Sequence, residues 1–193
     1  MNTDELLIKY RNGEREFSST DLADACLTER CLAAIDLSQS QLTNANLSGS
    51  DLQCANLSAT VLTRANLWRS NLTSASLVSA NLNQARLIRA TLIGIDGEGA
   101  SLQNTDLRLA NLQGANLSHV NLVGADLRYA DLTGVNLTGA NLSRANLTGA
   151  NLSQADLRGV TLNRAIFDNT DISDVSLLGV DLTQVDLRYA LLK

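Results

Sequence analysis

The chain has 193 residues, an apolar share of 45% and a formal net charge of −5. Aromatic residues make up only 3% and proline is absent, whereas a globular core of this size draws much of its volume from aromatic and branched side chains. The negative charge argues against direct binding to nucleic acid or to an anionic membrane, and no apolar run approaches the length of a membrane span. We therefore expect a thin interior that repeats many times along the chain.

Residues 1–16 stand apart from the remainder and are predicted to form a short N-terminal helical cap. A helix start, two acidic residues for the first turn and a terminating glycine occur in the expected order, at Thr3, Asp4, Glu5 and Gly13. The apolar side of this helix consists of Leu6, Leu7 and Tyr10. Such a helix would cover the open end of a repeat array, with Phe17 as the first inward residue.

A marker position recurs every five residues from Leu22 to Leu192. Thirty-two of these thirty-five markers are leucine, and the exceptions are Gly97, Phe167 and Ile172. The residue two positions before a marker is small or β-branched in every case except Arg30. The residue one position before is Asn or Asp in twenty-three cases. The unit is Ala-(Asn/Asp)-Leu-x-x, and it continues without a register break from about Asp21 to the C-terminus.

A period of five residues fits neither regular element. In an α-helix five residues turn by about 500°, so successive markers would wrap around the helix. In a straight strand an odd period would place alternate markers on opposite faces. All markers can face one interior only if the chain bends once per unit, with Ala and Leu inside, Asn or Asp outside and the last two residues in a turn. Whatever function exists is then expected in the three outward residues of each unit.

Glycine supports this assignment of the turn. Ten of the twelve glycines occupy the second position after a marker, where a tight turn with positive φ favours Gly or Asn. They are Gly49, Gly94, Gly99, Gly114, Gly124, Gly134, Gly139, Gly149, Gly159 and Gly179. The absence of proline agrees with backbone N–H groups that bond from coil to coil. The predicted fold class is therefore an all-β solenoid.

These residues resemble the pentapeptide-repeat family, whose unit is Ala-(Asp/Asn)-Leu-x-x. Residues 140–144 and 150–154 match that unit without adjustment, and the resemblance covers residues 17–193. It implies a right-handed quadrilateral β-helix with four units per coil and about nine coils, forming a single domain over residues 17–193. The N-terminal helix and the uninterrupted repeats are similar to those of members from photosynthetic bacteria.

The C-terminus shows no device that would cover the last coil, because the chain stops inside a unit. Uncovered coil edges invite pairing, and members of the family that protect DNA gyrase dimerise at their C-terminal ends. We therefore expect a tail-to-tail homodimer through Tyr189, Leu191 and Leu192. The alternative is a flanking segment that shields this end.

No motif predicts catalysis, so we expect a protein that is not an enzyme and has no cofactor or metal. His119 stands on a turn, where it is expected to be solvated, and no cluster of metal ligands is present. Cys26 and Cys31 fall on neighbouring sides, which favours free thiols over a disulfide. Because the first residues lack the features of a secretory signal, we predict a cytoplasmic location. Gly97, the marker that lacks a side chain, predicts either a pinched or bulged coil filled by Ile95, or a kink of the rod.

The outward residues are sorted by side if positions twenty apart are stacked. Nine of the eleven arginines within the repeats then lie on two adjacent sides. One of these sides carries the candidate partner surface, which consists of Trp68, Arg69, Arg86, Ile88, Arg89, Arg108, Leu109, Arg128 and Tyr129. Arginine with aromatic and apolar neighbours is typical of protein interfaces. The alternative is a solvated ion ladder of Arg108 and Arg128 with Asp106 and Asp126.

The lack of a catalytic motif beside an ordered surface predicts a protein-interaction or scaffold module with a protein partner of unknown identity. The family resemblance adds two alternatives. Some members imitate duplex DNA and modulate DNA gyrase, but here Asn slightly outnumbers Asp at the outward position, so acidic rows are broken. Another member regulates cell differentiation by binding to a transcription regulator's partner site.

Overall fold

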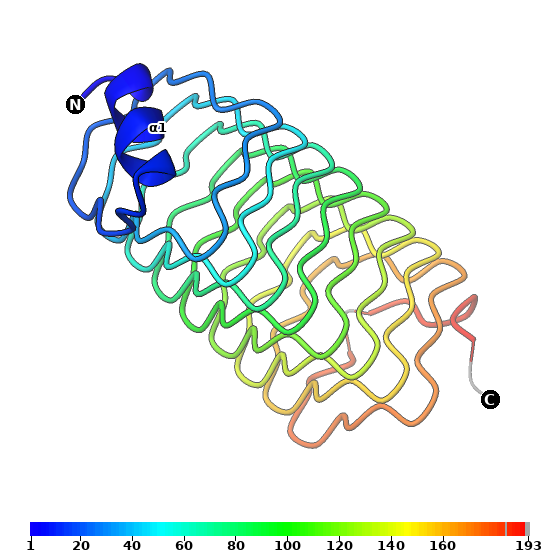
Figure 1. Ribbon diagram of the computed structural model, residues 1–193. Helices are drawn as coiled ribbons and strands as arrows, with labels where there is room; N and C mark the ends of the chain where they lie inside the picture. Colours follow the sequence, from blue (N-terminus) through cyan, green and yellow to red (C-terminus); the bar gives the residue numbers. More distant parts are fainter. Residues whose placement is uncertain (184, 192–193) are drawn as a thin grey trace.

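A computed structural model describes residues 1–183 and 185–191 and shows a parallel β-helix whose coils are stacked along one axis (Figure 1). Isolated parallel bridges join residues twenty positions apart, from Glu16 with Asp36 to Asp171 with Leu191. Each coil therefore contains four five-residue units. Almost every described unit contributes a single bridge residue, Asp181 being an exception, so the ladders run along the rod without named strands. In the described part of the chain the one helix is α1, Thr3–Arg11.

The inner positions form a continuous core. From Leu22 to Leu162 no leucine at a marker position is more than 3% exposed, and the alanines two positions before the markers are also buried. Serine and threonine replace alanine at several of these inner positions. Their hydroxyls donate to main-chain carbonyls, as Ser50 does to Leu47 and Thr60 does to Leu37. Among the described residues no buried side-chain nitrogen or oxygen lacks a hydrogen-bond partner.

The unit at residues 47–51 shows why proline is absent. All five of its N–H groups donate hydrogen bonds, over donor–acceptor distances of 2.7 to 3.2 Å. Two N–H groups bond to the following coil, one bonds to the preceding coil and one closes the turn. The fifth, that of Ser48, donates to the side-chain oxygen of Asn46. A proline at any of these positions would remove one bond from the ladder or the turn.

The turn geometry is the same along the rod. Every second residue after a marker has positive φ from Ser19 to Gly179, comprising twenty-three residues other than glycine and ten glycines. The predicted left-handed turn position is therefore confirmed. The expected preference for Gly or Asn is only part of the rule, because Arg, Gln and Ser are also common there. None of the twenty-three is Val, Ile or Thr, since a β-branched side chain clashes in this region.

Gly97 interrupts neither the ladder nor the turns. Asp96 bridges residues in both adjacent coils, and the N–H of Gly97 donates to the Asn116 carbonyl over 2.8 Å. A Cβ at Gly97 would lie 2.9 Å from Leu117 Cδ2 and 3.7 Å from Ile95 Cδ1. The side chain that glycine lacks is thus replaced by a neighbour from the next coil together with Ile95. The ladder therefore keeps its register at Gly97, which argues against a bulge.

Helix α1 lies at the N-terminal end of the rod (Figure 1). Its N-cap is Asn2, whose side-chain oxygen accepts a hydrogen bond from the N–H of Glu5, so the predicted N-cap, Thr3, is instead the first helical residue. Leu6 is fully buried, and Leu7 and Tyr10 pack against the core. Within the described ranges, no helix is long and apolar enough to cross a membrane.

Candidate interaction surface

Four stacked units bring the predicted surface residues together. We call the side formed by residues 66–69, 86–89, 106–109 and 126–129 the Arg-rich face. Bridges join these units in order, since residue 66 pairs with 86, 86 with 106 and 106 with 126. The nine candidate residues therefore share one side of the rod over four consecutive coils. Five arginines and two aspartates give this face a formal charge of +3, against −5 for the whole chain.

Large apolar side chains are exposed on the same face. Trp68 is 42% exposed, Leu109 is 47% exposed and Tyr129 is 61% exposed. Ile166 and Tyr189 continue this row towards the C-terminus and are also exposed. Aromatic and aliphatic groups in such positions lose contact with water only when another surface covers them.

An open groove of about 380 Å³ lies within the Arg-rich face. Its walls come from three successive coils and consist of Ile88, Arg89, Arg108, Leu109, Arg128 and Tyr129. Tyr129 is held above a glycine of the next coil, because a Cβ at Gly149 would lie only 2.6 Å from its ring atoms. The combination of an aromatic residue and a glycine twenty positions later is a sequence signal for this arrangement that our sequence analysis missed.

Two of the groove arginines form an ion ladder with their neighbours. Arg108 makes a two-point contact with Asp106, over 2.8 and 2.7 Å, and Arg128 does the same with Asp126. Arg108 Nε also lies 3.6 Å from Asp126 Oδ2, which links the two pairs. The ion ladder proposed as the alternative thus exists, but it occupies only these two arginines.

The ladder shifts the acid–base properties of its members. Partial burial would raise the pKa of the Asp126 carboxyl, but hydrogen bonds from the Arg128 side chain and backbone outweigh it. With the added charges of Arg128 and Arg108, the pKa of Asp126 falls below its ordinary value. The hydrogen bond from Arg108 to Asp106 raises the pKa of that guanidinium. Arg108, Arg128 and Asp126 therefore remain charged and oriented at neutral pH.

The other arginines of the face are available to a ligand. Arg86 and Arg89 are exposed, and neither forms an ion pair within residues 1–183 and 185–191. The Arg69 guanidinium lies 5.2 Å from the ring centre of Trp68. The face thus combines fixed, paired cations at its centre with unpaired cations beside them.

The outward Asn and Asp residues mainly serve the fold. Each of the twenty-three that precede a marker accepts a hydrogen bond from the N–H two residues later, as Asp36 does from Ser38 and Asn136 from Thr138. This local bond favours the turn and explains the residue type. The outward Asn or Asp of these units therefore has a structural role, and the expectation that function lies in the outward residues stays a prediction.

The remaining chemical candidates stay apart from one another. Cys26, Cys31 and Cys54 are free and exposed, and the hydrogen bond from Thr28 lowers the pKa of the Cys26 thiol. His119 lies over Gly139 on a turn. No group of three or more His, Cys, Asp or Glu side chains able to hold a metal ion occurs in the part of the chain that the structure describes.

The architecture of bridged five-residue units defines a β-solenoid, and sequence comparison identifies its family. A model described as pentapeptide repeats matches eight copies in overlapping segments that span residues 40–188. The chain therefore belongs to the pentapeptide-repeat family, which confirms the predicted resemblance. No functionally curated protein matches the sequence.

Solved structures of the same family are similar to this chain. HetL, involved in heterocyst differentiation regulation in the cyanobacterium Nostoc sp. strain PCC 7120, is 33% identical, with 100% of this chain and 97% of HetL covered and a TM-score of 0.46. QnrB1, a plasmid-mediated fluoroquinolone resistance protein, is 20% identical, with 92% and 89% covered and a TM-score of 0.67. Rfr23 from the cyanobacterium Cyanothece 51142 is 27% identical, with 85% and 99% covered and a TM-score of 0.21. Membership of this family, together with the likeness to QnrB1, implies a right-handed quadrilateral β-helix.

Proposed function

We propose that this chain is a protein-interaction module without enzymatic activity, and that the Arg-rich face binds a protein partner. The observation that supports this proposal is the groove between Arg89, Leu109 and Tyr129, in which exposed apolar groups stand beside unpaired cations. Interface centres are enriched in aromatic residues and arginine. Regulation by binding, as in the alternative drawn from the family, would be one form of this function.

The Arg-rich face contains both paired and unpaired arginines, and this difference supports the same proposal. The paired Arg108 and Arg128 would form a flat floor that needs no rearrangement on binding. The unpaired Arg86 and Arg89 would supply the charge that attracts acidic groups of the partner. Trp68 and Tyr129 would provide the apolar contacts at either end of the face. A partner segment that alternates acidic and apolar residues fits this arrangement.

Charge reversal on the face tests the proposal. The protein and its variants are used to capture partners from the native host, and the captured proteins are identified by mass spectrometry. Arg89→Glu and Tyr129→Ala should each remove the partner that the unmodified chain retains. Arg144→Glu is the matched control, because Arg144 is an exposed arginine on the equivalent turn position of another side. A partner that survives both face substitutions would contradict the proposal, provided that each variant keeps its circular dichroism spectrum.

Modulation of DNA gyrase is the rival that the family suggests. Imitation of duplex DNA requires continuous acidic rows, whereas the outward position holds twelve Asn and eleven Asp. Several of the aspartates are also neutralised by arginine, as Asp106 and Asp126 are. We therefore rank this function below the interaction module. Gyrase supercoiling that is inhibited or protected by the chain at stoichiometric concentration would reverse this ranking.

We further infer that the two ends of the rod have different roles. Residues 1–16, which include helix α1, would form a cap. Residues 17–193 would form a single domain of about nine coils, and the cap would cover the N-terminal end of this domain. The last coil would pair with a second copy, tail to tail. Tyr189 is 64% exposed and Leu191 is 45% exposed, while Leu192 lies outside the described residues. A cytoplasmic location remains a prediction.

A further inference from the structure

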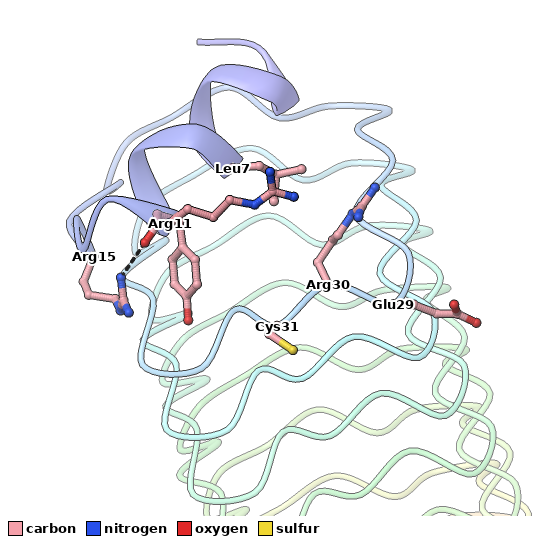
Figure 2. Close-up of a pocket in the computed structure, with 7 residues that line it drawn as sticks. Leu7, Arg11, Arg15, Glu29, Arg30 and Cys31 are labelled. Carbon is pink, nitrogen blue, oxygen red and sulfur yellow. Dashed lines mark hydrogen bonds between the residues drawn. The ribbon is translucent and has the colours of Figure 1, made fainter.

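A second cationic site lies between α1 and the first coil, about two coils away from the Arg-rich face. An open cleft of about 470 Å³ is lined there by Leu7, Tyr10, Arg11, Arg15, Glu29, Arg30 and Cys31 (Figure 2). Three arginines in one cleft are unexpected in a chain whose net charge is −5. No sequence motif predicted this site, although Arg30 departs from the repeat.

Arg30 breaks the strongest rule of the repeat. It occupies the inner position two residues before a marker, where every other unit has a small or β-branched residue. The same position in the next two coils is filled by Ser50 and Ser70, each 1% exposed. Arg30 is exposed, since the first coil has no coil before it and its side chain can turn towards α1. A departure from an otherwise uniform pattern at an accessible position is typical of a functional residue.

The arginines of the cleft lack carboxylate partners. Arg11, Arg15 and Arg30 form no ion pair within residues 1–183 and 185–191, where the nearest pair along the chain is Lys9 with Glu5 at 3.4 Å. Glu29 is the one acidic residue that lines the cleft. Figure 2 shows its carboxylate pointing away from the cleft, and its Cγ lies over Gly49 of the following coil.

One of the three guanidinium groups is fixed in place. Arg15 donates from Nη1 to the carbonyls of Tyr10 and Glu14, over 2.9 and 2.8 Å, and its Cζ lies 3.9 Å above the Tyr10 ring. Tyr10 is fixed in turn, because its hydroxyl donates to the Ala33 carbonyl over 2.8 Å. Arg11 extends from α1 over the cleft, and Arg30 rises towards the helix from the first coil (Figure 2). Neither has a hydrogen bond in the described chain that would occupy its guanidinium.

We propose that this cleft binds an oxyanion, either a carboxylate or a phosphate group, between Arg11 and Arg30. Guanidinium groups match the planar or tetrahedral oxygens of these anions and can contact two of them at once. Arg15 contributes positive charge from the rigid wall, while Leu7 and Tyr10 offer an apolar surface to the remainder of the ligand. The site shares no lining residue with the groove of the Arg-rich face, so its test can fail or succeed separately from that of the proposed function.

The test uses the full-length chain labelled with ¹⁵N and follows the Nε–Hε signals of its arginines. Inorganic pyrophosphate, succinate and hexaglutamate are added separately, with sodium chloride at matched ionic strength as the reference. We expect at least one of the three probes to shift the Arg11 and Arg30 signals in a saturable way. A response to pyrophosphate alone indicates a phosphate ligand, a response to succinate a small carboxylate, and a markedly stronger response to hexaglutamate an acidic peptide segment.

Arg30→Ser separates binding from folding, because serine is the residue at the same position of the next two coils. This variant should fold normally and weaken the Kd of the responding probe by about tenfold or more. Arg144→Ser, on a distant coil, should leave the Kd unchanged. The proposal is overturned if none of the probes moves the arginine signals beyond the sodium chloride reference, or if Arg30→Ser binds as tightly as the unmodified chain.

Discussion

Residues at the inner positions are buried to different extents at the two ends of the rod. At the N-terminal end Phe17 and Leu22 are 4% and 3% exposed, because α1 lies beside them and Leu6 is fully buried. At the C-terminal end Leu182 is 37% exposed, although it occupies the same kind of marker position. Val185 and Leu187 are only partly buried. A place at an inner position is therefore not sufficient for burial in this fold, which also requires a neighbouring layer.

This difference follows from the one-dimensional construction of a solenoid. Each coil covers the core of its neighbours and receives its hydrogen bonds from them. A terminal coil has one neighbour fewer, so its apolar residues must meet a helix, another copy or water. The ends are therefore the places where the repeat cannot determine the structure, and they offer the sharpest tests.

The largest effect is expected from shortening the fully buried leucine of α1, at the N-terminal end of the rod. Leu6→Ala should lower the free energy of unfolding by about 3 kcal/mol, because it leaves a cavity at a fully buried site. Leu182→Ala at the opposite end should cost less than about 1 kcal/mol, since that side chain is already partly in water. Urea unfolding followed by circular dichroism measures both. Equal losses for the two variants would show that the two ends do not differ as described.

A second, smaller effect is expected on dimerisation through the C-terminal coil. Light scattering should give twice the chain mass of 20.6 kDa at micromolar concentration, because a second copy would cover the partly exposed inner residues. Leu187→Lys, at an inner position of the last coil, should weaken the dimer by about tenfold or more. Leu178→Lys is the control, since Leu178 points outward and is 76% exposed. A monomeric mass for the unmodified chain at all concentrations would rule out this dimer.

The smallest effect should appear in acid. Asp186 in the last coil has its pKa lowered to about 2 by hydrogen bonds from Arg188 and by the charge of that arginine. A lowered pKa means that the folded chain favours the ionised carboxylate. The contribution of this pair to stability is therefore present above about pH 4, the ordinary range of the group, and is lost as the pH falls towards 2.

Titration of individual carboxyl groups distinguishes the end of the rod from its middle. Carboxyl ¹³C titration should show that Arg188→Gln returns the Asp186 pKa towards 3.8. The Asp186 side chain is 51% exposed and that of Asp126 is 29% exposed, so 1 M salt should raise the pKa of Asp186 more than that of Asp126. Identical salt shifts at the two sites would contradict this difference in screening.

Much of the candidate surface could be predicted once a period of twenty was assumed. The spacing alone places Trp68, Ile88, Arg108 and Arg128 in one column, and the bridges confirm that stacking. The spacing could not tell which arginines are paired, because Asp106 lies beside both Arg86 and Arg108 but forms its ion pair with Arg108, within its own unit. The cleft beside α1 was also beyond prediction, since the helix does not share the repeat and its position is not encoded by a period.

The amino-acid sequence was sufficient to predict the five-residue unit, its inward and outward positions and the left-handed turn. These features depend on contacts within five residues or on a strict period, so local steric and hydrogen-bonding rules are sufficient. The three-dimensional structure was needed to show that Leu117 and Ile95 fill the space at Gly97, that Tyr129 lies over Gly149 and that Arg30 turns towards α1. The same holds for the exposure of the last coil. Each of these depends on which side chain stands one coil away or on whether a further layer is present, and no local rule contains that information.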